Sequence, residues 1–153
     1  MNFEVQLLKK SILIVDDDEA LSESIKEVLA SRGFQNIHVA YSISEGINVF
    51  SVSHIDLIIL DVMLPDGEGY LLSEYVRESS DVPILFLTAK NNPDDEIRGL
   101  DSGGDDYVTK PFLPKSLTYR IIALLRRAYK DESEIIELDN CTIDLSSASV
   151  KKK

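Results

Sequence analysis

The sequence has very little cysteine and lacks any long apolar run. Cys141 is the single cysteine, so we expect no internal disulfide and no cysteine-based zinc site. The longest clean apolar runs, 12–15 and 57–60, fall far short of the roughly 18 residues needed to cross a bilayer. The N-terminus also lacks the basic, apolar and small-residue order of a signal peptide. We therefore expect a cytoplasmic protein with no membrane contact.

Positive charge is also scarce. The chain has 16 Lys and Arg against 27 Asp and Glu, which gives a formal net charge of −11. Since phosphate contacts require clustered Lys and Arg, this balance argues against nucleic-acid binding by the chain itself. An acidic surface suits a cation or a basic partner, although acidity can also simply keep a protein soluble. At 153 residues, of which 44% are hydrophobic and 28% charged, the composition is that of one compact domain.

Short apolar runs alternate with helical patterns along most of the chain. The runs cover 12–15, 37–40, 57–60 and 84–87, with a weaker one at 107–108. The helical segments extend from Asp17 or Asp18 to Gly33, from Ser42 or Ser44 to about Ser51, over 67–79, from Pro93 to 103–104, and onward from Pro114. This alternation predicts an α/β fold in which helices cover both faces of a parallel sheet, with five strands and five helices.

Four of the predicted strands end in polar, reactive side chains. They are an acidic triplet at 16–18, Asp61, Thr88 and Lys110. In a parallel open sheet, ligands collect at the carboxyl ends of the strands, beside the point where strand order reverses. Taken singly, the triplet could mark a helix N-terminus, Asp61 a turn, Thr88 a strand end and Lys110 the surface. Four independent explanations would then be needed together, so we expect these residues to form one site.

The residue types at these strand ends indicate phosphoryl chemistry around a metal ion. Carboxylates that repel one another persist most easily around a divalent cation, and hard oxygen ligands select Mg²⁺ or Mn²⁺. Asp61, opposite Asp16 and Asp17, can act as a nucleophile that forms an aspartyl phosphate. Lys110 can pair with one phosphoryl oxygen and the Thr88 hydroxyl can bond another.

Four stretches within about residues 11–129 resemble the response-regulator receiver family. They are ILIVDDDEA, LIILDVMLPDGEGY, VPILFLTAK and GLDSGGDDYVTKPF, in the family's order and at suitable spacing. We accordingly predict a flavodoxin-like, doubly wound five-stranded sheet of order 2-1-3-4-5. The resemblance implies that a sensor histidine kinase phosphorylates Asp61. It also implies a metal site formed by Asp17, Asp61 and the Met63 carbonyl, with Asp16 acting through water. Thr88 and Lys110 would contact the phosphoryl group, and Tyr107 would be the aromatic switch residue.

The segments 98–107 and 124–127 are similar to the OmpR/PhoB-type subfamily. In that subfamily the fourth helix, the fifth strand and the fifth helix form a symmetric dimer face, which implies a homodimer of the phosphorylated form. Our candidates for the ion pairs of that face are Arg98, Asp105, Asp106, Arg120 and Arg126, which could equally form an ordinary solvated surface. Gly104 departs from the alanine that is usual at its position.

The chain changes character after Tyr129. Residues 130–134 are polar, and 135–138 and 142–145 then alternate like the opening strands of a winged-helix DNA-binding domain. We therefore predict a receiver domain at 1–129 and, at 130–153, a linker with the incomplete start of a DNA-binding domain. We expect a fragment of a longer transcription factor rather than a truncated regulator, with DNA bound only through the missing domain.

Other functions compete with this interpretation. A phosphatase of the haloacid-dehalogenase type would use Asp16 and Asp18, but Ala20 stands where its motif needs threonine or valine. A flavodoxin-like binding module would need a Ser/Thr/Gly-rich phosphate loop after the first strand. A pseudo-receiver would have lost one of the acids or the lysine. We predict a phospho-accepting regulatory domain, not an enzyme, which assists its own phosphorylation and dephosphorylation.

Overall fold

The computed structural model describes residues 3–89 and 93–130, so the predicted strands at 135–138 and 142–145 lie outside the described residues. The main sheet is parallel and has the order β2-β1-β3-β6-β7. Its strands are β1 (Ser11–Val15), β2 (Asn36–Ala40), β3 (Leu57–Leu60), β6 (Ile84–Thr88) and β7 (Asp106–Thr109). The predicted α/β fold and its strand order 2-1-3-4-5 are confirmed.

Five helices connect or follow these strands. They are α2 (Glu19–Arg32), α3 (Ile43–Val52), α4 (Tyr70–Arg77), α5 (Pro93–Asp101) and α6 (Pro114–Ala128). Asp18 caps α2 by accepting a hydrogen bond from the Leu21 N–H at 3.0 Å, and Gly33, with φ of 109°, ends that helix. Ser42, not Ser44, caps α3. Polar side chains therefore cap the starts of α2 and α3, and a glycine ends α2.

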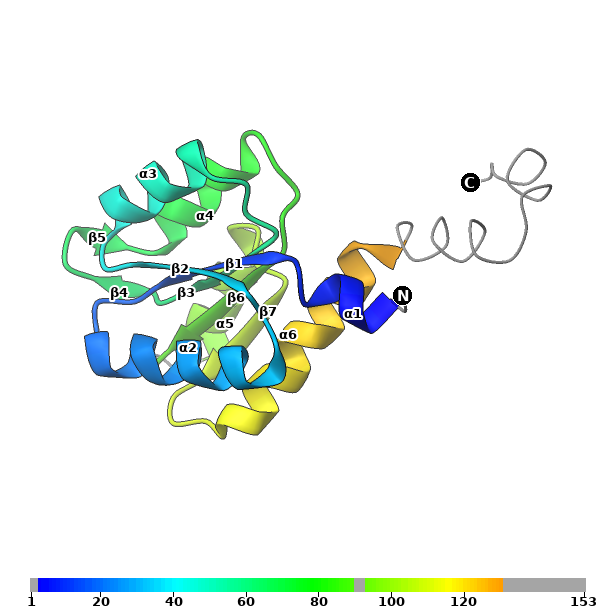
Figure 1. Cartoon of the computed structure of the whole chain (residues 1–153). Coiled ribbons are helices and arrows are strands. Elements are labelled where there is room, and N and C mark those ends of the chain that lie inside the picture. The colour runs from blue at the N-terminus through cyan, green and yellow to red at the C-terminus, as the bar shows by residue number, and fades with distance from the viewer. Residues whose placement is uncertain (1–2, 90–92, 131–153) are drawn as a thin grey trace.

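The strands separate two apolar cores, because successive side chains of a strand point to opposite faces of the sheet. Ile12 and Ile14 of β1 pack in the core with α2 and α6, whereas Leu13 and Val15 pack in the core with α3 and α4. Figure 1 shows these helix pairs on opposite sides of the sheet. Burial on both faces explains why the inner strands β1, β3 and β6 are almost entirely apolar, whereas the edge strands β2 and β7 are only partly buried and carry polar residues.

A short hairpin of two strands and a short helix were not predicted from the sequence. Gly67 has φ of 145°, which a helix cannot contain, so α4 begins at Tyr70 rather than at the predicted residue 67. Instead β5 (Gly67–Glu68) pairs with β4 (Met63–Leu64) in an antiparallel hairpin. Before β1 lies α1 (Phe3–Leu7), too short to show periodicity, although Leu7 is buried in the core. Across 3–89 and 93–130, no helix has the length and apolar character of a membrane span.

Candidate functional site

The candidate site lies at the carboxyl edge of the sheet, where backbone hydrogen bonds continue past the strand ends. The Asp61 N–H donates to the Val15 carbonyl at 2.9 Å, and the Lys110 N–H donates to the Thr88 carbonyl at 2.8 Å. These bonds hold the first residues beyond β3 and β7 in line with the sheet. The predicted residues are therefore positioned by regular strand pairing.

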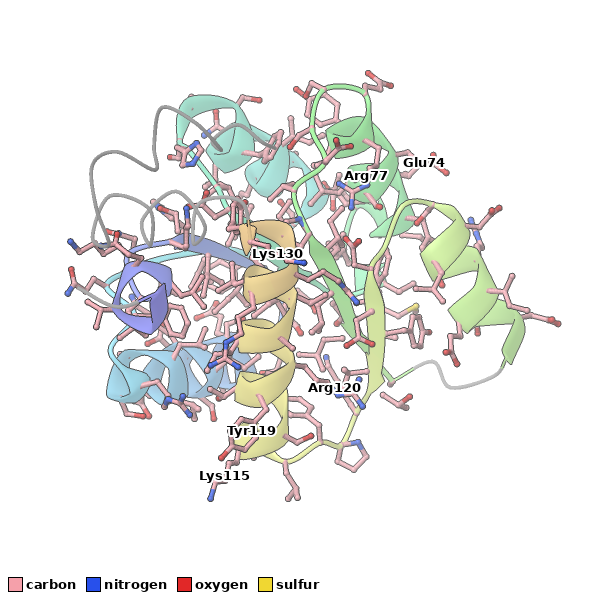
Figure 2. The ribbon with its side chains drawn as sticks, turned by 90° about the vertical axis from the view of Figure 1, so that its right-hand side faces the viewer. Glu74, Arg77, Lys115, Tyr119, Arg120 and Lys130 are labelled. Atoms are coloured by element: carbon pink, nitrogen blue, oxygen red, sulfur yellow. The ribbon has the colours of Figure 1, made fainter. Side chains whose placement is uncertain are left out.

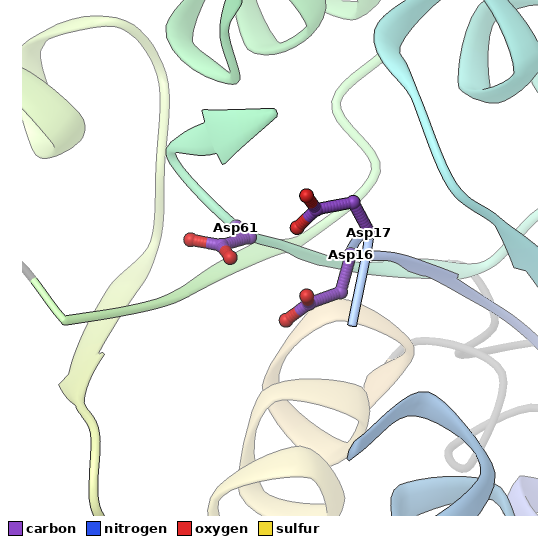
Figure 3. Close-up of side chains that lie close together, drawn as sticks. All are labelled: Asp16, Asp17 and Asp61. Atoms are coloured by element: carbon purple, nitrogen blue, oxygen red, sulfur yellow. The ribbon is translucent and has the colours of Figure 1, made fainter. Parts of the chain in front are cut away.

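Three acidic side chains converge at this edge. Asp16, Asp17 and Asp61 each offer a carboxylate oxygen, and these oxygens all lie within 4.8 Å of one another (Figure 3). Asp16 and Asp61 are buried, at 2% and 5% exposure, whereas Asp17 is exposed. Three closely spaced hard oxygen ligands with one open side fit Mg²⁺ or Mn²⁺, and such a cation would offset the repulsion between the acids.

Lys110 already offsets part of this negative charge. Its Nζ lies 3.0 Å from Asp16 Oδ2 and 3.1 Å from Asp61 Oδ2, with its side chain 22% exposed. Burial alone would lower the pKa of Lys110, but hydrogen bonds to the two carboxylates raise it above its ordinary value. Burial raises the pKa of Asp16, although the Asp18 N–H and Lys110 both oppose that shift. The lysine is therefore kept protonated, facing the oxygens that a phosphoryl group would approach.

The remaining predicted residues surround this centre. The Met63 N–H donates to Asp61 Oδ1 at 3.2 Å, so Met63 is fixed beside the acid. Thr88 is fully buried at the end of β6. The ring of Tyr107, on β7, packs 6.2 Å from that of Phe86, and burial is the main cause that raises the pKa of Tyr107. The roles predicted for these residues stay predictions.

Two residues that hold the loop after Asp61 were not predicted from the sequence. A side chain on Gly69 would overlap the main-chain oxygen of Asp61, so only glycine allows the loop to pack there. Asp66 accepts hydrogen bonds from the Ile43 and Ser44 N–H groups at 2.9 and 3.0 Å, which fastens the loop to the start of α3. These bonds lower the pKa of Asp66. The Pro-Asp-Gly sequence at 65–67 indicates a turn but gives no sign of this distant partner.

The predicted dimer-face residues have contacts within the chain. Asp106 accepts two hydrogen bonds from Arg120, at 3.0 and 3.2 Å; Arg120 projects from α6 (Figure 2). Asp105 instead accepts from Arg77, on α4, at 2.9 Å. Arg98 pairs with Glu68 at 2.8 Å, and Arg126 is exposed on α6. Within the chain, two of the candidates thus pair with each other, and Asp105 and Arg98 have partners outside the candidate set. The dimer face stays a prediction.

Comparisons with known proteins agree with this geometry. A family model described as "Response regulator receiver domain" matches residues 12–122. "Transcriptional regulatory protein YvrH" of Bacillus subtilis is 46% identical over 122 residues, which cover 80% of this chain and 52% of that protein. "Phosphate regulon transcriptional regulatory protein PhoB" of Escherichia coli is 37% identical over 147 residues, which cover 94% of this chain and 64% of that protein. The chain therefore spans less than two thirds of the length of these relatives.

Solved structures share the fold. A crystal structure of a two-component response regulator from Clostridium difficile has a TM-score of 0.75 and 34% identity, and the match covers 78% of this chain and 98% of that one. A CheY-like receiver domain protein from Methanospirillum hungatei gives a TM-score of 0.76 at 30% identity, covering 80% of this chain and 98% of that one. Both matches extend over nearly the whole of the solved domains.

Proposed function

The chain belongs to the response regulator receiver domain family, and from this premise we propose that Asp61 accepts a phosphoryl group and thereby switches a transcription regulator. The observation that carries the proposal is the contact of Lys110 with both Asp61 and Asp16, inside a cluster of three carboxylates. Phosphoryl transfer to a carboxylate requires a nucleophile, a cluster of acidic residues that binds a cation, and a fixed positive charge.

The proposed reaction begins with a phosphohistidine of a sensor histidine kinase. An Asp61 carboxylate oxygen attacks phosphorus in line, an O–P bond forms, the N–P bond breaks and the imidazole of the kinase leaves. Lys110 pairs with a phosphoryl oxygen as charge spreads over it. Receiver domains bind Mg²⁺ at an acidic pocket, and here Asp16, Asp17 and Asp61 would hold it, with the Met63 carbonyl as a further ligand. The cation would supply charge neutralisation of the phosphoryl group.

We further propose that phosphorylation shifts a pre-existing equilibrium of the output surface. Thr88 would move toward the phosphoryl group and Tyr107 would turn into the space it leaves, favouring a homodimer through α5, β7 and α6. The candidate ion-pairing residues of that face are Arg98, Asp105, Asp106, Arg120 and Arg126. A Thr88→Ala variant should still be phosphorylated but should dimerise less; dimerisation equal to the parent's would contradict this coupling.

Relatives named as transcriptional regulators support a proposal for the domain organisation. We place the receiver at 1–129 and propose that 130–153 hold the linker and the first part of a winged-helix domain, through which DNA is bound. The phosphoryl donor is a sensor kinase and the compartment is the cytoplasm. The receiver transforms no separate substrate, but it assists its own phosphorylation and dephosphorylation.

Intact-mass analysis tests the acceptor residue. The parent, Asp61→Asn and Asp16→Asn are incubated with acetyl phosphate and Mg²⁺, with Asp81→Asn as a control for loss of an exposed acid. The parent and the control should each gain one phosphoryl group, whereas Asp61→Asn should gain none. Equal mass gain in the parent and Asp61→Asn would refute the assignment. A phosphoryl group that peptide mapping locates on Asp16 would instead favour a phosphatase.

A further inference from the structure

The guanidinium of Arg98, on α5, is held by two residues that follow Asp61 in the chain. Its Nη2 lies 2.8 Å from Glu68 Oε1, and its Cζ lies 4.5 Å from the centre of the Tyr70 ring. The first contact is an ion pair and the second a cation–π contact, and a planar guanidinium can make both at once. Arg98 is therefore engaged within its own chain, although it is also a candidate for the proposed dimer face.

Tyr70 fastens α5 by a second route. Its side chain is 1% exposed, and its hydroxyl donates a hydrogen bond to the Asp95 carbonyl of α5 at 3.1 Å. Its ring meets the ring of Phe86 edge-on at 5.4 Å, and Phe86 in turn packs against Tyr107. Tyr70 thus joins the start of α4 to α5 next to the predicted switch residue.

Glu68 and Tyr70 are linked to the phosphorylation site through a short, well-bonded stretch of chain. Glu68 pairs with Met63 across the β4–β5 hairpin, and the Met63 N–H donates to Asp61 Oδ1. Gly69 donates its N–H to the Val62 carbonyl at 2.8 Å and packs directly on the Asp61 main chain. A change at Asp61 can therefore reach Glu68 and Tyr70 through direct contacts.

We propose that Glu68 and Tyr70 form a latch that holds Arg98 and α5 away from the dimeric arrangement until Asp61 is phosphorylated. The proposal rests on the proposed function, because it assumes that activation produces a dimer through α5. Its basis is competition: a carboxylate of a second chain would compete with Glu68 for the charge of Arg98, which Glu68 and Tyr70 hold against their own chain. Whatever stabilises the internal pair shifts the equilibrium toward the monomer.

The size of the effect follows from the exposure of the pair. The side chains of Arg98 and Glu68 are 57% and 36% exposed, and such pairs typically change an equilibrium by about 1.4- to fivefold. A symmetric dimer releases two latches, so the change is squared. Loss of the ion pair should therefore tighten dimerisation of the unphosphorylated chain by about two- to 25-fold.

The test compares Glu68→Gln with Glu74→Gln, an equal charge change at an exposed position of α4 (Figure 2). Sedimentation equilibrium would measure the dimer dissociation constant of each chain, first alone and then with Mg²⁺ and beryllofluoride. In the unactivated state, we expect Glu68→Gln to dimerise more tightly than both the parent and Glu74→Gln. The three chains should converge once activated, because the latch is then already open.

A second variant tests the other attachment. Tyr70→Phe removes the hydroxyl, and with it the bonds to Asp95 and to the Tyr107 side chain, but leaves the ring beneath Arg98. Amide hydrogen exchange in α5 should therefore become faster than in the parent. If the activated parent dimerises but Glu68→Gln matches Glu74→Gln, the latch is wrong and the proposed function stands. If the parent is phosphorylated on Asp61 but never dimerises, the dimer and the latch both fail.

Discussion

Replacing Asp61 with asparagine should stabilise the metal-free chain and at the same time weaken its response to Mg²⁺. The carboxylate of Asp61 has two like charges nearby, Asp16 and Asp17, with ligand oxygens within 4.8 Å. It has one opposite charge, Lys110, at 3.1 Å. The substitution removes two repulsions and one attraction, so the sign of its effect depends on which is larger.

Coulomb's law decides between them. With an effective dielectric constant of about 20, each repulsion costs about 3.5 kcal/mol and the attraction contributes about 5.4 kcal/mol. The repulsions are therefore larger by about 1.5 kcal/mol, and solvent screening at the exposed Asp17 reduces that difference. Lys110 also keeps its contact with Asp16, at 3.0 Å. We expect Asp61→Asn to raise the free energy of unfolding by about 0.5–1.5 kcal/mol without metal.

Mg²⁺ should reverse this order of stability. A cation present at a hundred times its dissociation constant stabilises the folded parent by about 2.7 kcal/mol, which exceeds that difference. Asp61→Asn retains only two of the three carboxylates, so it should bind Mg²⁺ more weakly and gain less. Urea unfolding followed by circular dichroism, with EDTA and then with Mg²⁺, measures both effects in one series.

Asp81→Asn is the matched control, because Asp81 is an exposed acid outside the cluster and the net charge changes equally. The reasoning is refuted if metal-free Asp61→Asn is less stable than Asp81→Asn. It is equally refuted if Mg²⁺ stabilises Asp61→Asn as much as it stabilises the parent.

Three further predictions concern the surroundings of this cluster. Lys110→Met should slow phosphorylation by acetyl phosphate by about a hundredfold in a quenched time course, because the charge facing the phosphoryl oxygens is lost; an unchanged rate would contradict that role. The pKa of Asp66 is lowered from 3.8, so its stabilising contribution is present above that value and is lost as the pH falls through the lower folded value. Asp66→Asn should therefore flatten the acid limb of stability measured by urea midpoints, and an unaltered limb would disprove the assignment. A Cβ at Gly104 would lie 2.6 Å from the Phe86 ring, so Gly104→Ala should destabilise the chain by about 1–3 kcal/mol. The added change Phe86→Leu should recover most of that loss in thermal unfolding, and no recovery would show that the ring is not the obstacle.

The Gly104 position also shows how the structure explains a departure from the subfamily pattern. Alanine is usual at this position, and nothing in the neighbouring sequence accounts for glycine. In the folded chain the Phe86 ring occupies the space that a Cβ would need, and the Gly99 carbonyl lies 3.0 Å from the same point. The requirement for glycine at 104 thus comes from the side chain of Phe86 on β6, which is distant in the sequence, so no local pattern can reveal it.

Contacts between distant residues account for the other features that the sequence analysis missed. Asp66 reaches the start of α3 across 23 residues, and Arg77 reaches Asp105 across 28. Glu68 is a partly exposed and Arg98 an exposed charged residue, and their pairing depends on the path of the β4–β5 hairpin. The hairpin itself escaped prediction because each strand has only two residues, too few to show a period.

The placement of Asp16, Asp61 and Lys110 at one edge was determined by the sequence alone. Parallel strands end at the same edge of their sheet, so a polar residue after each apolar run is brought there by strand pairing. The tertiary structure decided what those residues touch: Lys110 bonds to both Asp16 and Asp61, and Gly69 packs against Asp61. It also decided that Arg98 is held within its own chain, because side-chain partners depend on how loops cross in space, whereas strand ends depend only on the order of elements.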